Sequence, residues 1–163
     1  MKFGVLKDIK ADEYRVIATP AEVAMIARTG AEVWVQKDAG KGAGFSDEAY
    51  AAEGAKIVDT MEEIYANCDF VAKVKELEER EFDLIRENQI IFTCIHPAAH
   101  PAEVDALLAH KAVSFAAEDS HRYGSPNCEA AGKIGAMMGL NSLLSCNGGK
   151  GKFVNGFGGA PGV

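Results

Sequence analysis

The chain has 163 residues, of which 17 are Lys or Arg and 24 are Asp or Glu, so that its formal net charge is −7. This acidic balance argues against nucleic acid and against membranes as partners, because binding to either anionic surface depends on clustered positive charge. The hydrophobic share of 48% and a length that suits one domain predict a soluble globular protein.

Up to about residue 125, short apolar runs alternate with stretches whose apolar residues recur at helical spacing. The runs are rich in β-branched residues and predict six strands, at 2–6, 32–36, 56–58, 70–75, 89–95 and 111–117. Residues that typically begin a helix predict four helices between them, at Thr19-Pro20, Ser46, Thr60 and Pro101. A fifth helix, polar and exposed, is predicted over 76–86.

This alternation predicts an α/β fold over residues 1–125: a three-layer, doubly wound domain with a mainly parallel sheet, of the Rossmann or flavodoxin type. The runs at 70–75 and 89–95 are continuous, which is typical of strands buried on both faces. We therefore expect these two strands at the centre of the sheet.

The composition changes after about residue 125. Residues 127–146 are rich in glycine and alanine but keep helical spacing, and they predict one long helix. Glycine destabilises a helix by roughly 1 kcal/mol, so we expect a neighbour that packs closely against this one. Glycine-rich segments follow at 147–152 and 156–162. These segments predict that the chain leads into a further element that it lacks.

The cysteines and histidines show no metal-binding motif. Four cysteines are widely spaced, without a C-x-x-C pair: Cys68, Cys94, Cys128 and Cys146. No two histidines are spaced as a helical metal pair, so no metal site is predicted, and free thiols in a reducing cytoplasm are favoured. No apolar run reaches the length of a membrane span, and charges interrupt the N-terminus too early for a signal peptide.

Three candidate site residues follow predicted strands. Ligands of open α/β sheets bind beyond the carboxyl ends of the strands, and there the chain has Arg15, Lys75 and His96. A guanidinium can bind a carboxylate with two hydrogen bonds, an ammonium can bind a carbonyl oxygen, and an imidazole can transfer a proton. Together they suit a small keto acid or amino acid.

Each of these residues also has a structural interpretation. Arg15 suits an exposed loop, and His96 suits a structural histidine. Lys75 suits an ion pair with Glu76, and for Lys73 a structural or surface role is favoured.

Three glycine clusters are candidate nucleotide-binding loops, but their spacing does not support a nucleotide site. The clusters at 40–44, 149–152 and 156–162 lack the spacing of a dinucleotide fingerprint or a P-loop. They predict turns, and no complete site for a cofactor phosphate is evident.

Several segments together resemble the alanine dehydrogenase family, which includes the α subunit of nicotinamide nucleotide transhydrogenase. The matching segments are Met1 to Asp8, Glu13-Tyr14-Arg15 through Pro20, Gly40 to Asp47, Lys73 to Glu76, Ile91 to His96, Gly148 to Gly151 and Gly159 to Val163. The segment that ends at His96 is closer to alanine dehydrogenase than to the transhydrogenase.

In that family, reduced nicotinamide converts pyruvate and ammonia reversibly to alanine. The resemblance implies that Arg15 and Lys75 bind the carboxylate and carbonyl of the substrate, and that His96 is the acid/base or carbonyl-polarising group. It implies that 126–163 is a linking helix and the start of a dinucleotide-binding domain that this chain lacks. It also implies a homo-oligomer and NAD as the cofactor, held mostly outside this chain by a Rossmann domain or a separate Rossmann-domain chain. We expect no hydride transfer by these residues alone.

The chain departs from the family where Pro126-Asn127-Cys128-Glu129 replaces Pro-Met-Ser-Glu. The resemblance places Asn127 beside the substrate, and an amide there implies a substrate side chain more polar than methyl. Four functions stay open: the substrate-binding part of an alanine-dehydrogenase-like oxidoreductase, a part of an opine-type imine reductase, a non-catalytic domain that binds a small carboxylate or assembles with itself, and a flavodoxin-like domain with another ligand.

Overall fold

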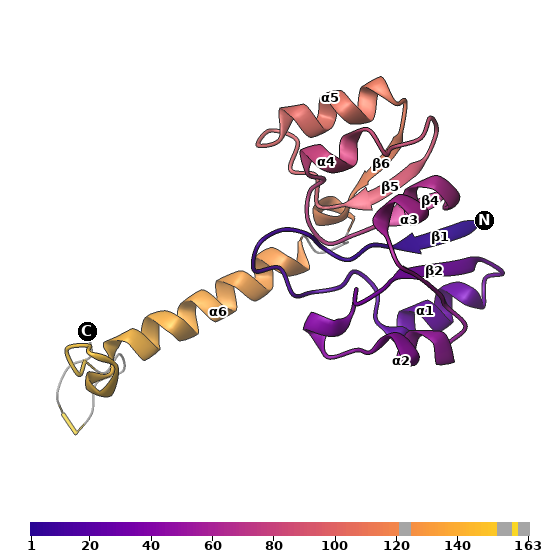
Figure 1. Ribbon diagram of the computed structural model, residues 1–163. Coiled ribbons are helices and arrows are strands. Elements are labelled where there is room, and N and C mark those ends of the chain that lie inside the picture. Colours follow the sequence, from indigo (N-terminus) through magenta and orange to yellow (C-terminus); the bar gives the residue numbers. More distant parts are fainter. Residues whose placement is uncertain (121–124, 153–157, 160–163) are drawn as a thin grey trace. The chain divides into compact units, whose positions relative to one another are not determined.

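The computed structural model describes residues 1–120, 125–152 and 158–159, in two compact units, Met1–Ser120 and His121–Val163 (Figure 1). The first unit holds the sheet and the second holds a long helix. Within the described parts of the chain, no helix has both the length and the apolar character needed to cross a membrane.

The first unit is built on a six-stranded parallel sheet with the order β3-β2-β1-β4-β5-β6. Its strands are β1 (Lys2–Val5), β2 (Glu32–Gln36), β3 (Lys56–Val58), β4 (Phe70–Ala72), β5 (Ile90–Thr93) and β6 (Val113–Ala116). Each strand lies within one of the six apolar runs, which confirms the predicted α/β fold. The chain builds outward from β1 to β3 and then places β4 on the other side of β1, so the strand order reverses between β1 and β4.

The two strands at the centre of the sheet are β1 and β4. The prediction is therefore right for 70–75 but wrong for 89–95, because β5 lies one place further out. Gly4 interrupts the apolar run of β1, so this strand lacks the continuous apolar pattern from which a central strand is predicted. A Cβ atom on Gly4 would lie only 2.4 Å from Cγ2 of Ile64 in α3 (Met61–Asn67), so the glycine allows this helix to pack closely on the strand.

The helices predicted from their first residues are all present: α1 (Pro20–Ala27), α2 (Asp47–Ala52), α3 and α5 (Pro101–Ala109). Ser46 caps α2 by accepting the backbone N–H of Ala49 at 3.3 Å. In α3, the Thr60 hydroxyl accepts the N–H of Glu63 at 3.3 Å, and the Glu63 carboxylate accepts the N–H of Thr60 at 3.0 Å. These reciprocal bonds satisfy N–H groups that the first helical turn leaves unpaired.

Helices cover both faces of the sheet, and each face has its own hydrophobic core. Successive residues of a strand point to opposite faces. Val33 and Val35 pack in one core with Val23 of α1, whereas Trp34 packs in the other with Ile64 of α3. Residues of α5 join the core of Trp34. This is the three-layer arrangement that the sequence predicts.

The prediction of a polar, exposed helix over 76–86 is wrong in both extent and exposure. The helix α4 covers only Glu79–Phe82, and Glu81 is 1% exposed. The Glu81 carboxylate accepts a hydrogen bond from the Lys73 ammonium at 2.7 Å in the interior, so its charge does not indicate a surface position. Leu77, just before the helix, is buried in the core.

The second unit contains the long helix predicted over 127–146. This helix, α6, spans Pro126–Leu143, and a short 3₁₀ turn, η3 (Ser145–Asn147), follows it. Of the glycine-rich segment 156–162, only 158–159 lie within the described residues.

Candidate functional site

Four strands of the first unit lead into loops that carry charged or polar side chains. The loop after β1 carries Asp8 and Arg15, and the segments after β4, β5 and β6 carry Lys75, His96 and Glu118 in turn. Because the strands are parallel, these segments share one edge of the sheet, where the strand order reverses between β1 and β4. Open α/β sheets bind ligands at such an edge.

The backbone of Lys75 is held from both sides. The Asp8 carboxylate accepts the N–H of Lys75 at 2.8 Å, and the Thr93 hydroxyl donates to the carbonyl oxygen of Lys75. Asp8 and Thr93 are buried, whereas Lys75 is half-buried. Three neighbouring strand ends therefore position one lysine at the reversal point.

Arg15 is paired with Glu13 in the loop after β1. Its Nε donates to Glu13 Oε1 at 2.7 Å and a terminal nitrogen donates to Oε2 at 2.5 Å, so the guanidinium makes the two-bonded contact that it could make with the carboxylate of a ligand. The hydrogen bond from Arg15 lowers the pKa of Glu13, and the Lys75 ammonium adds to the lowering. The Arg15 side chain is 51% exposed, which leaves it accessible.

The glycine-rich segment 40–44 forms one wall of a cavity beside Arg15. It folds as a 3₁₀ turn, η1 (Lys41–Ala43), as the sequence predicts. The cavity, of about 280 Å³, is lined mainly by charged residues of this segment and of the loop after β1. A Cβ atom on Gly42 would lie 2.9 Å from the carbonyl oxygen of Tyr14, so the glycine lets the two loops approach.

His96 stands at a sharp turn after β5. Its φ of 45° lies in the left-handed region, which is rare for residues other than glycine and recurs at functional sites. The Glu118 carboxylate accepts the N–H groups of His96 at 2.7 Å and of Ile95 at 3.2 Å. Burial would raise the pKa of Glu118, but these hydrogen bonds and the nearby imidazole hold it below its ordinary value. The His96 side chain is 43% exposed and can meet a ligand.

Two neighbours link the three predicted site residues. Arg15 and Lys75 are both close enough to Glu13 to lower the pKa of its carboxyl. Arg15 also interacts electrostatically with Cys94, whose sulfur lies within 4.8 Å of a ring nitrogen of His96. The structure thus brings Arg15, Lys75 and His96 to one edge of the sheet.

Two other residues singled out from the sequence lie elsewhere. Lys73 is 1% exposed and donates to Glu81 at 2.7 Å, and the same carboxylate accepts the hydroxyl of Tyr65 at 3.0 Å. Lys73 thus has the structural role that the sequence favours. Asn127 belongs to α6, in the second unit.

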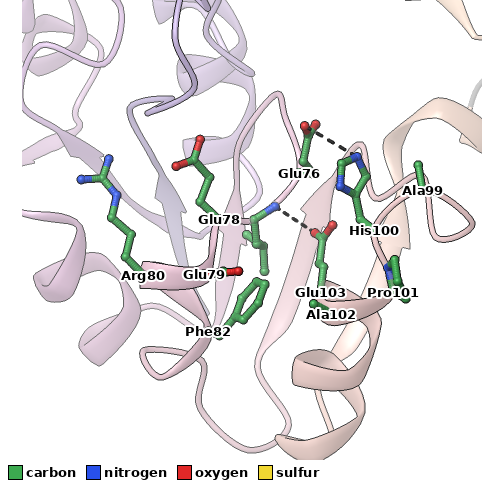
Figure 2. A pocket seen from close by; sticks show the side chains of 11 residues that line it. Glu76, Glu78, Glu79, Arg80, Phe82, Ala99, His100, Pro101, Ala102 and Glu103 are labelled. Carbon is green, nitrogen blue, oxygen red and sulfur yellow. Dashed lines mark hydrogen bonds and ion pairs between the residues drawn. The ribbon is translucent and has the colours of Figure 1, made fainter.

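A second pocket, of about 570 Å³, lies between α4 and α5 (Figure 2). His100 Nε2 lies 3.7 Å from Oε1 of Glu76, and Oε1 of Glu103 accepts the N–H of Leu77 at 2.9 Å. The Oε2 atoms of Glu76 and Glu103 are buried, and the described residues offer neither of them a hydrogen-bond partner. Burial raises the pKa of Glu103 to about 7. This pocket contains none of the three predicted site residues.

Three residues of the site are not evident from the sequence, Asp8, Glu13 and Thr93, whereas Glu118 directly follows the predicted strand at 111–117. Of the three, only Glu13 has a local signal, because it stands two residues before Arg15 in the chain. Asp8 and Thr93 hydrogen-bond to the backbone of Lys75, which is 67 positions from Asp8 and 18 positions from Thr93 in the chain. Local spacing cannot reveal such pairs.

The described site does not fit a dinucleotide. The turn after the first strand of a dinucleotide site needs glycines that let the backbone approach the pyrophosphate, whereas residues 6–19, between β1 and α1, contain no glycine. Residues 1–120 share the strand order of a dinucleotide-binding domain but lack its phosphate-binding turn.

Comparisons with known proteins identify the family. The family model described as alanine dehydrogenase/PNT, N-terminal domain, matches residues 4–126. The alanine dehydrogenase of Mycolicibacterium smegmatis is 39% identical over 169 aligned residues, which cover 100% of this chain and 45% of that protein. The alanine dehydrogenase of Methanococcus maripaludis is 38% identical and is matched over 100% of this chain and 44% of its own length.

Solved structures agree with these matches. An L-alanine dehydrogenase structure superposes with a TM-score of 0.87 at 32% identity, covering 99% of this chain and 46% of that one. The transhydrogenase from Sinorhizobium meliloti, with a TM-score of 0.72 at 18% identity over 89% of this chain and 43% of its own, shares the fold. The chain spans less than half the length of the curated relatives it matches. It belongs to the alanine dehydrogenase/PNT family, whose N-terminal domain matches its residues 4–126.

Proposed function

We propose that this chain is the substrate-binding part of an alanine-dehydrogenase-like oxidoreductase, which converts a 2-keto acid such as pyruvate, with ammonia and reduced nicotinamide, reversibly to an amino acid. The observation that carries the proposal is the position of Arg15, Lys75 and His96 after β1, β4 and β5, at the edge where the strand order reverses. The imine reductase and the non-catalytic carboxylate-binding domain are not favoured by the comparisons.

Arg15 binds the carboxylate of the keto acid in this proposal. The guanidinium already makes two hydrogen bonds to the Glu13 carboxylate, and the substrate takes the place of Glu13. An arginine with its planar donor group suits this exchange, because carboxylates of similar geometry bind it interchangeably.

Lys75 and His96 act on the reacting carbon of the keto acid. The Lys75 ammonium donates to the ketone oxygen and draws electron density from the carbonyl carbon, which makes that carbon more electrophilic. His96 transfers a proton to or from the substrate, and Glu118 orients it by holding its backbone N–H at 2.7 Å. Ammonia then adds to the polarised carbon, and in the reverse direction water adds to the same carbon of the imine.

Pyruvate titration of the whole chain, followed by calorimetry, tests the proposal. We expect Arg15→Ala and Lys75→Ala to weaken pyruvate binding by about 10-fold or more, because each removes a charged hydrogen bond worth roughly 1.5–3 kcal/mol. The exposed Arg28 and Lys111 provide matched controls, and Arg28→Ala and Lys111→Ala should bind as the wild type does. Circular dichroism confirms that each variant is folded. Equal binding by all four variants, or none by the wild type, would contradict the proposal.

For the substrate side chain, we propose Asn127 as a contact, on the family resemblance. The wild type is expected to prefer a 2-keto acid with a polar side chain over pyruvate, and Asn127→Met to reverse that preference. An unchanged ratio of the two affinities would remove Asn127 from the site.

NAD is held, in this proposal, by protein other than residues 1–120, because the loop after β1 lacks glycine. A sample of residues 1–120 that binds pyruvate should therefore not bind NADH. Fluorescence of the nicotinamide measures NADH binding. A cytoplasmic location is part of the proposal, because the wide spacing of the four cysteines along the chain favours reduced thiols.

Self-association completes the proposal. Three apolar residues of α6, Ile134, Met137 and Met138, are 55%, 68% and 64% exposed. Exposed clusters of apolar side chains often mark interfaces between proteins. Sedimentation of the whole chain should give a mass above that of one chain, and Met137→Glu should lower it. A monomer at all concentrations would contradict this part.

A further inference from the structure

Three side chains of different chemistry meet where β5 and β6 end. Cys94 and His96 follow β5, and Glu118 lies in the 3₁₀ turn after β6, η2 (Ala117–Asp119). β5 and β6 are adjacent parallel strands, so these segments leave the sheet next to each other. One possible ligand atom from each of the three residues lies within 4.8 Å of the other two.

We infer that Cys94, His96 and Glu118 form a binding site for a divalent transition metal, and that Zn²⁺ is the ion that fits it. A thiolate, an imidazole and a carboxylate are the ligands that zinc takes in proteins, whereas Mg²⁺ and Ca²⁺ prefer oxygen alone. Three protein ligands leave a fourth position open for exchange with solvent or a small ligand. The spacing along the chain does not predict this site, because the third ligand comes from another strand.

The distances between the ligand atoms suit a tetrahedral zinc ion after small movements of the side chains. Ideal zinc bonds place a nitrogen and an oxygen ligand about 3.3 Å apart, and Nδ1 of His96 lies 3.4 Å from Oε1 of Glu118. A sulfur ligand should lie about 3.6 Å from the nitrogen, so the cysteine and histidine have to approach by up to about 1 Å. The His96 side chain, 43% exposed, has room for that movement, whereas Cys94 is 4% exposed and fixed by its surroundings.

The Glu118 ligand is already oriented for a metal. The Glu118 carboxylate is oriented by the N–H groups of Ile95 and His96, at 3.2 and 2.7 Å, and hydrogen bonds of this kind hold metal ligands in place.

Metal binding would withdraw His96 from proton transfer, because the ion occupies a nitrogen lone pair of the imidazole. Zinc is therefore expected to inhibit the proton transfer assigned to His96, while Arg15 and Lys75 remain able to bind the substrate. This inhibitory role rests on the proposed function, whereas the metal binding itself does not.

Metal titrations of the whole chain test the site directly. The exposed thiols Cys128 and Cys146 are replaced by serine in every sample, so that they do not bind metal. Cobalt(II) then reports on the ligands, because a thiolate produces a sulfur-to-metal charge-transfer band. We expect one equivalent of cobalt to give this band together with the visible bands of a tetrahedral ion, and zinc to displace it.

Variants of the ligands sharpen the test. Cys94→Ser should abolish the charge-transfer band and weaken zinc binding by at least 10-fold, measured against a chromophoric chelator. His96→Ala should weaken zinc binding similarly, and His110→Ala, at the end of α5, should leave it unchanged. Should the serine variant not fold, Glu118→Gln takes its place, with the same loss of affinity expected. A cobalt spectrum without the sulfur band, or zinc affinity equal in wild type and His96→Ala, overturns the site.

Pyruvate titrations with and without zinc separate this inference from the proposed function. Pyruvate binding in the presence of a chelator, with no zinc binding, overturns the metal site alone. Zinc binding without pyruvate binding supports the metal site and contradicts the proposed function. Where both bind, one equivalent of zinc should leave the pyruvate affinity unchanged, because Arg15 and Lys75 hold the substrate, and a loss of about 10-fold overturns an inhibitory role confined to the proton transfer of His96.

Discussion

The Asp8 carboxylate accepts the backbone N–H of Lys75 at 2.8 Å, which joins the loop after β1 to the end of β4 at the point where the strand order reverses. Thr93 completes the arrangement by donating to the carbonyl oxygen of the same residue. Lys75 is thus positioned through its peptide groups by buried side chains from the strand ends on either side. A side chain that must meet a ligand gains precision when its backbone is held in this way.

Thr93→Val should weaken pyruvate binding by about 2- to 10-fold, because it removes one hydrogen bond, worth roughly 0.5–1.5 kcal/mol, that fixes the backbone of Lys75. Calorimetry checks the affinity. Thr29→Val is a matched control, because the Thr29 hydroxyl makes the same kind of bond, to the carbonyl of Ile26 at 2.7 Å, at the end of α1. An equal loss in the two variants would contradict a positioning role.

Gly42→Ala should weaken pyruvate binding, because the added methyl group displaces the loop that carries Arg15. The new Cβ would lie 2.9 Å from the carbonyl oxygen and 3.1 Å from the Cα atom of Tyr14, and these backbone atoms must shift to make room. The adjacent arginine shifts with them, so the affinity measured by calorimetry should fall by a few-fold or more. Gly132→Ala, on α6, places its Cβ where no neighbouring atom of the described residues lies within 4 Å, and it should leave the affinity unchanged. Unaltered binding by Gly42→Ala would show that the loop tolerates the displacement.

Much of the fold can be predicted from the sequence because its signals are local. Thr60 and Glu63 form their capping box within one helical turn, and each strand is short enough for one apolar run to mark it. The central position of β1 is not predictable in this way, because Gly4 serves a contact with Ile64 that only the packed fold shows.

The candidate site is predictable only in part, for a related physical reason. Strand ends can be located along the chain, and Arg15, Lys75 and His96 follow three of them. The hydrogen bond between Asp8 and Lys75 and the approach of Glu118 to His96 depend on which strands become neighbours. Strand order is a property of the whole sheet, and local spacing does not contain it.

Lys73→Met should lower the free energy of unfolding by about 3–5 kcal/mol, because it leaves the Glu81 carboxylate buried without its cation. Adding Glu81→Gln should recover part of that loss, since the amide is neutral and its oxygen can still accept the Tyr65 hydroxyl. Urea unfolding monitored through Trp34, the only tryptophan, measures both effects. Lys111→Met breaks an exposed pair with Glu87 and should cost about 0–1 kcal/mol. A cost for Lys73→Met no larger than this would show that the interior pair contributes little.

Glu103 should make the stability of the wild type fall as pH rises from about 4.5 to about 7. Burial raises the pKa of Glu103 from its ordinary value of 4.5 to about 7, against opposition from the N–H of Leu77 and the Lys73 ammonium and with help from the Glu81 and Glu118 carboxylates. The folded protein therefore holds this proton more tightly than the unfolded chain. Its contribution to stability is complete below pH 4.5 and is lost as pH rises through 7.

Glu103→Gln isolates this contribution, because the amide is neutral at every pH and its oxygen can still accept the N–H of Leu77. The free energy of unfolding of Glu103→Gln should match that of the wild type near pH 4.5 and exceed it by an amount on the order of 2 kcal/mol at pH 8. Urea unfolding at a series of pH values measures the difference. The exposed Glu53 supplies the control, and Glu53→Gln should differ from the wild type by the same small amount throughout. A difference for Glu103→Gln that stays constant with pH would mean that the Glu103 carboxyl ionises as it does in water, and that the pocket between α4 and α5 is open to solvent.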